Sequence, residues 1–169
     1  MSQGAESASG ASSGVADALE RLLALEEIRA LQAAYWHVLD GKEWDEMAGL
    51  FAPDAVMDFP GDRGGRTRGA GNCVAFIRER VGAAVTVHHG HTPQITFESP
   101  DLARGRWAME DLIRWPEDAP LRGVRALHGR GHYHNTYVRS GGRWWISRTS
   151  VTRLRVDLTN LDGELVREI

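Results

Sequence analysis

The stretch ARGRWAMEDLIRW, residues 103–115, alternates between two kinds of side chain. Its odd-numbered positions are apolar or small except Asp111, whereas most of its even-numbered positions are charged. Because successive side chains of a β-strand point to opposite faces, this pattern predicts a strand with one face in the core and one in water. The same geometry predicts that the Asp111 carboxyl lies in an apolar interior.

Comparable period-two patterns occur on both sides of this stretch, and turn signals separate them. Such signals are the Ser-Pro-Asp of residues 99–101, the two prolines within residues 116–120 and the Ser-Gly-Gly of residues 140–142. We therefore expect further strands at residues 55–59, 85–89, 94–98, 123–139 and 143–156.

Helical periodicity comes before these strands in the chain. Apolar residues recur at three- and four-residue steps from Leu19 to Leu39, which predicts one long amphipathic helix that ends near Gly41. Shorter helices are expected at residues 43–51 and 73–81, with a loop at 60–72 between them.

Helices followed by long strands indicate the α+β class, here as N-terminal helices packed on a curved antiparallel sheet. A sheet curled around a helix encloses a mostly apolar pocket, which is a natural site for a small molecule. We expect one domain over residues 15–157, a disordered Ser/Gly/Ala tail at 1–14, and a C-terminal tail with little pattern at 158–169.

Composition restricts the function classes. The 169 residues carry a formal net charge of −3, which provides no electrostatic footprint for nucleic acid or an anionic membrane. A single cysteine, Cys73, excludes an internal disulfide and a multi-cysteine zinc site. There is neither a secretory signal pattern nor an apolar run near the roughly 20 residues of a membrane span, so we expect a cytoplasmic protein.

Two carboxyl groups are in unusual positions. Asp111, on the apolar face of its strand, is interpreted as a general acid or an orienting group, although binding backbone groups at a sheet bend is the alternative. Asp40 lies at the C-terminal end of the long helix, where its charge opposes the helix dipole. It is either a functional residue or a solvated turn residue before Gly41.

Histidines are concentrated in the run VTVHHGH, residues 85–91. His88 and His89 must point to opposite faces of a strand, so one imidazole can enter the pocket while its neighbour is solvated. The pattern does not decide which of His88, His89 and His91 faces the pocket. A histidine that faces a carboxylate is a competent base near neutral pH, because the carboxylate fixes its tautomer and stabilises its cation.

A metal site is the alternative use of the histidines. His132 and His134 lie two residues apart on one strand face, and a carboxylate would be needed to complete a facial triad. Nothing in the sequence fixes that third ligand, so we expect neither a metal nor a cofactor.

Three segments together resemble a known family. They are the helix end with Tyr35 and Asp40, the strand start HHGH at 88–91, and the close GHYHNTYV at 131–138 followed by Trp144 and TRLR at 152–155. Over residues 19–157 the chain resembles the SnoaL-like branch of the nuclear transport factor 2-like superfamily, which includes dehydratases and a dehydrochlorinase.

The resemblance implies a cone-shaped α+β barrel and a site in which Asp40 orients the base His88. Tyr35 and Asp111 match further catalytic positions, and Arg153 matches a pocket arginine, with Arg148 as its competitor. Further pocket-lining residues are expected to be Phe59, Trp107, Met109 and Tyr133.

The implied activity is a cofactor-independent, dehydratase-type elimination on a hydrophobic polycyclic, steroid-like or polyketide-like molecule. Alternatives are an isomerase or cyclase that uses the same base, and a non-catalytic binding module in which Asp40 and His88 are a structural pair. Leu39 and Phe59 replace the tyrosine pair of scytalone dehydratase, so scytalone is not the expected substrate. The resemblance also implies a homo-oligomer, either a dimer or a trimer.

Overall fold

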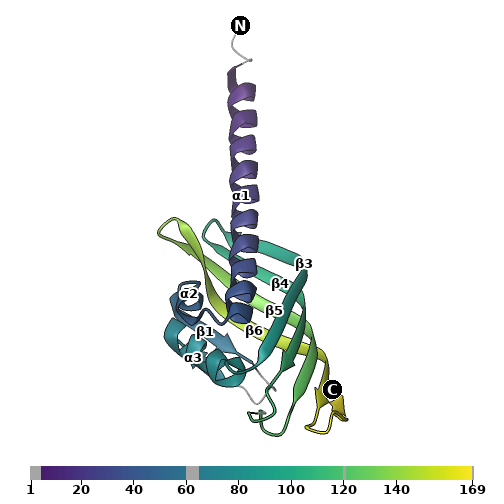
Figure 1. The fold of residues 1–169 in the computed structure, drawn as a ribbon. Coiled ribbons are helices and arrows are strands. Elements are labelled where there is room, and N and C mark those ends of the chain that lie inside the picture. Colours follow the sequence, from purple (N-terminus) through teal and green to yellow (C-terminus); the bar gives the residue numbers. More distant parts are fainter. Residues whose placement is uncertain (1–4, 60–64, 120, 169) are drawn as a thin grey trace.

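The computed structural model describes residues 5–59, 65–119 and 121–168. Its helices lie on one side of a curved sheet (Figure 1). The elements in chain order are α1 (Ala5–Gly41), α2 (Trp44–Ala48), β1 (Phe51–Asp58), β2 (Arg66–Arg68), α3 (Ala70–Val81), β3 (Val85–Ser99), β4 (Leu102–Arg114), β5 (Ala126–Ser140), β6 (Arg143–Thr159) and β7 (Leu165–Glu168). The α+β class predicted from the sequence is confirmed.

The sheet has the strand order β2-β1-β6-β5-β4-β3, and β7 pairs with β6 outside this path. β1 runs parallel to β6, whereas the other paired strands are antiparallel, so the sheet is mixed and not purely antiparallel as expected. Among the described residues β2 and β3 are the two edges and do not pair with each other. The sheet is therefore curved but open.

Two predicted strands, at residues 85–89 and 94–98, form the single strand β3. The pairing of β3 with β4 shifts register between His91 and Gln94, and Thr92 adopts a φ of 41°. Such a bulge bends a strand without ending its pairing, which explains why the local sequence pattern divides there. The expected loop at 60–72 contains β2 and the start of α3, and its residues 60–64 lie outside the described residues.

Both expected tails differ from the structure. α1 begins at Ala5, inside the segment predicted to be a disordered tail. Extending a helix that is already nucleated needs only one further backbone hydrogen bond per residue, so the packed half of α1 favours continuation into this Ala-containing segment. At the other end, β6 continues to Thr159 and β7 pairs with it. Among the described residues, no helix combines the length and apolar character needed to cross a membrane.

α1 buries apolar side chains against the sheet along its C-terminal half, and the Arg21 guanidinium also lies over the Phe97 ring of β3, 5.2 Å from its centroid. Ile28 and Tyr35 are buried, while residues 14–23 are exposed, and Figure 1 shows this first half extending beyond the sheet. Close packing on β3 depends on Gly90, because a Cβ atom there would lie 1.7 Å from the Trp36 ring. Trp36 in turn packs edge-on against Trp107 of β4, with 5.3 Å between ring centroids. The helix thus closes one side of the space above the sheet.

Candidate active site

Asp40 and His88 form a direct pair between the end of α1 and the start of β3. His88 Nδ1 lies 2.7 Å from Asp40 Oδ1, and the His88 backbone N–H donates to Asp40 Oδ2 over 2.8 Å. The side chain of His88 is buried and that of Asp40 is partly exposed. Because Nδ1 is bound to the carboxylate, Nε2 is the ring nitrogen left to act on a ligand.

Thr86 and Lys42 form a chain of hydrogen bonds that ends on the Asp40 carboxylate. The Thr86 hydroxyl donates to Asp40 Oδ1 over 2.8 Å and accepts a hydrogen bond of 2.6 Å from Lys42 Nζ. Burial alone would raise the pKa of Asp40, but the hydrogen bonds from His88 and Thr86 outweigh it and lower that pKa. Asp40 is therefore ionised at neutral pH and able to stabilise a protonated His88.

Asp111 forms a buried ion pair with Arg153. Nη1 and Nη2 of Arg153 each donate to one carboxylate oxygen of Asp111 over 2.8 Å. This bidentate arrangement suits an ionised carboxylate, so it favours the orienting role considered for Asp111 over that of a protonated acid. Gly129 makes room for the pair, since a Cβ atom there would lie 2.1 Å from Asp111 Oδ1 and 2.4 Å from Arg153 Nη1.

Tyr35 places a neutral hydroxyl group near this polar cluster. Its ring lies edge-on to Phe51 and Tyr133, with centroid distances of 5.9 and 6.3 Å. Burial raises the pKa of Tyr35 far above its usual range, and the nearby Cys73, Asp40 and Asp111 raise it further. Tyr35 is consequently a hydrogen-bond donor that strongly resists losing its proton.

A cavity of about 290 Å³ connects these groups. It lies between α1, α3 and the inner side of the sheet, and Tyr35, His88, Asp111 and Arg153 all contribute to its wall. The apolar part of the wall comes from Leu39, Phe59, Phe76, Ile77, Val81, Ile113, Trp115, Leu121, Val124, Leu127, Tyr133, Val151, Val156 and Leu158. Glu79, Arg80 and Arg122 line it as well. A mostly apolar cavity with convergent polar groups is the usual form of a small-molecule site.

A model of the SnoaL-like domain family matches residues 20–150. The chain belongs to this family. One structure of similar fold is an NTF2-like protein with a cystatin-like fold from Novosphingobium aromaticivorans. That structure is 21% identical, with a TM-score of 0.66 over 84% of this chain and 89% of the other.

Two further solved structures share the fold of this SnoaL-like domain. A type 2 hexachlorocyclohexane dehydrochlorinase, LinA, has a TM-score of 0.72 at 20% identity, covering 83% of this chain and 91% of the other. A protein proposed to be a scytalone dehydratase, from Novosphingobium aromaticivorans DSM 12444, has a TM-score of 0.72 at 21% identity, covering 88% and 92%. At this identity the likeness concerns the fold.

Most of the site residues predicted from the sequence come together in the SnoaL-like domain. Those that line the cavity are Tyr35, Phe59, His88, Asp111, Tyr133 and Arg153. Asp40 lies behind His88 and is not itself in the wall. Met109 was expected in the wall but does not line the cavity; its Sδ lies 3.5 Å from Arg153 Nη1.

Two predicted residues lie apart from the cavity. Trp107 is in the core and donates to the Tyr137 hydroxyl over 2.9 Å. Arg148 pairs with Asp58 over 2.8 Å and does not line the cavity, whereas Arg153 does, together with Arg80 and Arg122. The expectation that Trp107 and Arg148 line the pocket is not met, because each is engaged by another element.

Thr86 and Lys42 were not among the site residues predicted from the sequence. Thr86 precedes His88 by two residues, so strand alternation places both on one face, and this signal was available. Lys42 follows Gly41 beyond the end of the helical pattern and adopts a φ of 62°, which no periodicity indicates. Among the three neighbouring histidines, His88 faces the cavity while His89 and His91 are exposed.

Proposed function

We propose that this SnoaL-like protein is a cofactor-independent lyase that eliminates water from a hydrophobic ring compound of the steroid or polyketide kind. The observation that carries the proposal is the 2.7 Å contact between Asp40 and His88 at the wall of a mostly apolar cavity. The dehydrochlorinase and dehydratase structures of the same fold agree with a role in elimination.

In the proposed reaction, Nε2 of His88 removes a proton from a carbon atom next to a carbonyl group. The electron pair of that C–H bond moves toward the carbonyl as an enolate, and the Tyr35 hydroxyl donates a hydrogen bond to the enolate oxygen. Tyr35 serves as a donor and does not transfer its proton, because its raised pKa disfavours the tyrosinate.

The second half of the reaction expels the leaving group. The enolate electrons form the new carbon–carbon double bond as the bond to the β-hydroxyl group breaks. The imidazolium of His88, stabilised by Asp40, returns its proton to the departing hydroxide, so water leaves and the base is regenerated. The Asp111–Arg153 pair provides a fixed polar end in the cavity that orients an oxygen-bearing substituent.

The test is a screen of apolar β-hydroxy ketones with ring systems, followed by mass spectrometry of the products. We expect products that lack one water, and His88→Gln should lower the rate by about 10²- to 10⁴-fold, which is typical for loss of a general base. Asp40→Asn should lower kcat with little change in ligand affinity. The matched control is His132→Gln, which alters a histidine outside the cavity wall and should turn over like the parent.

Other outcomes point to the alternatives. A product of unchanged mass that still depends on His88 would replace elimination by isomerisation or cyclisation. Tight binding without turnover, equal in the parent and in His88→Gln, would identify a binding module.

A further inference from the structure

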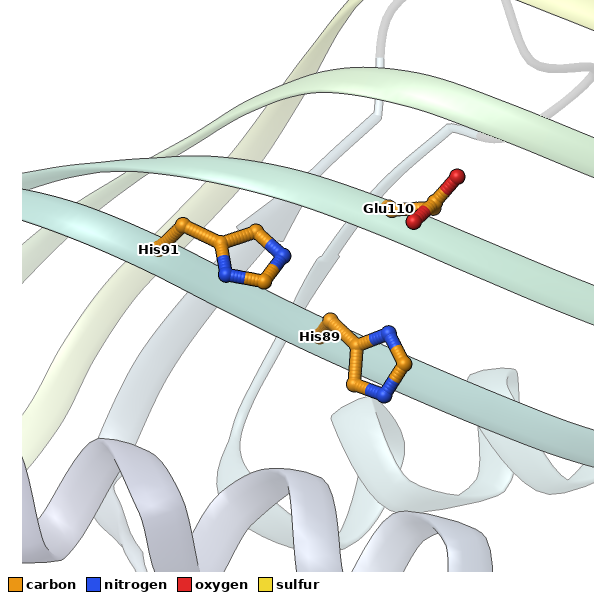
Figure 2. Close-up of side chains that lie close together, drawn as sticks. All are labelled: His89, His91 and Glu110. Atoms are coloured by element: carbon orange, nitrogen blue, oxygen red, sulfur yellow. The ribbon is translucent and has the colours of Figure 1, made fainter.

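The outer face of the sheet carries a second group of histidines, unrelated to the cavity. His89 and His91 alternate with His88 along β3, so they project to the opposite face, and both are exposed. Glu110 on β4 is the direct cross-strand partner of His89. Figure 2 shows the two imidazole rings and the Glu110 carboxylate on neighbouring strands, on the same side of the sheet.

The three side chains have the spacing of a metal site. One ligand atom from each lies within 4.8 Å of the ligand atoms of the other two. Around a single ion with bonds of about 2.0–2.2 Å, neighbouring ligand atoms stand roughly 3–4 Å apart. His89 and His91 are exposed, so rotation about their side-chain bonds can bring the ligand atoms closer together.

Neighbouring groups on β5 prepare Glu110 for this role. His128 Nε2 lies 2.5 Å from Glu110 Oε1, and Arg130 Nε lies 3.5 Å from the same oxygen. Because both contacts use Oε1, the carboxylate is oriented and Oε2 is left for a ligand, as outer-shell partners do in metal centres.

The charge around the group is compatible with a cation. Arg130 Nε lies 3.5 Å from Glu110 Oε1, and Arg130 Nη1 is paired with Asp157 Oδ2 over 3.3 Å. Two neutral imidazoles and one carboxylate are the donor set that transition metals prefer, whereas Mg²⁺ and Ca²⁺ prefer oxygen ligands alone.

We propose that His89, His91 and Glu110 bind one divalent transition-metal ion of the Zn²⁺, Ni²⁺ or Cu²⁺ class on the outer face of the sheet. Three protein ligands on two adjacent strands leave the remaining coordination positions to water. This site is separate from the proposed active site, because β3 directs His88 to the other side of the sheet. The pair His132 and His134, considered from the sequence, belongs to no such group of three among the described residues.

The test is calorimetric titration of the full chain without an affinity tag, stripped with chelator, using Zn²⁺ alone. We expect one equivalent to bind. His91→Ala and Glu110→Gln should each weaken binding by at least about tenfold, since loss of an outer-shell partner alone costs 10- to 100-fold. His132→Ala is the matched control, because it removes an imidazole from an equivalent His-x-His pair on β5 and should leave the affinity unchanged.

Three results would overturn the proposal. They are the absence of saturable binding by the parent protein, equal affinity of the parent and the His91→Ala variant, or loss of binding in His132→Ala. Circular dichroism of each variant checks that it is folded, which is expected because His91 and His132 lie outside the core. The readout is independent of any enzymatic activity.

Discussion

At the scale of single residues, the candidate site depends on a glycine, Gly129. Asp111 and Arg153 meet in the cavity wall because Gly129, paired with Asp111 across β4 and β5, has no Cβ atom. A buried ion pair tolerates little displacement, because displacement weakens the attraction that compensates each charge for the loss of water.

The replacement Gly129→Ala therefore tests the pair directly. The new methyl group would overlap Asp111 Oδ1 and Arg153 Nη1, so we expect a loss of about 1–3 kcal/mol in the free energy of unfolding. Urea unfolding measures this change. The matched control is Gly71→Ala in α3, where a Cβ atom meets nothing within 4 Å, and stability should hold or rise slightly. Equal stability of the parent and Gly129→Ala would contradict the account of the ion pair.

At the scale of elements, α1 has two halves with different energetics. Ile28, on the half of α1 that packs on the sheet, is fully buried, whereas Leu19 on the projecting half is 55% exposed. We expect Ile28→Ala to cost about 2–5 kcal/mol through lost burial and the cavity left behind. Leu19→Ala should change stability by less than about 0.5 kcal/mol. Thermal and urea unfolding of the two variants check the difference, and similar losses would mean that the first half of α1 packs against something.

The helices and strands also show which features of the site could be predicted from the sequence. Strand alternation in residues 103–115 correctly placed Asp111 on the buried face, and helical periodicity correctly placed Asp40 at the end of α1. Alternation also separated His88 from His89, but the choice between the two faces required the pairing of β3 with β4. Local pattern carries no information about partners distant in the chain, so the Asp111–Arg153 pair and the parallel pairing of β1 with β6 became visible only in the structure.

At the scale of the whole molecule, the sheet separates two chemical environments. The inner side carries the cavity with His88, and the outer side carries the exposed group of His89, His91 and Glu110. Because the proposed elimination uses only proton transfer, it requires no ion from the outer side.

Chelation should consequently leave turnover unchanged. We expect equal kcat and KM before and after treatment with a strong chelator, measured on the substrate found in the screen. The control is the same protein reloaded with Zn²⁺ at one equivalent. Loss of activity in chelator with recovery on reloading would show that the two sides of the sheet are coupled, or that a metal takes part in the reaction.

The projecting half of α1 has a consequence for how the molecule moves in water. Residues 5–23 form a rod of about 28 Å at 1.5 Å per residue, attached to one end of a rounded body (Figure 1). Tumbling of such a particle is anisotropic, since rotation about the long axis meets less friction than end-over-end rotation. Amide groups parallel and perpendicular to α1 should therefore report different correlation times in nuclear magnetic relaxation.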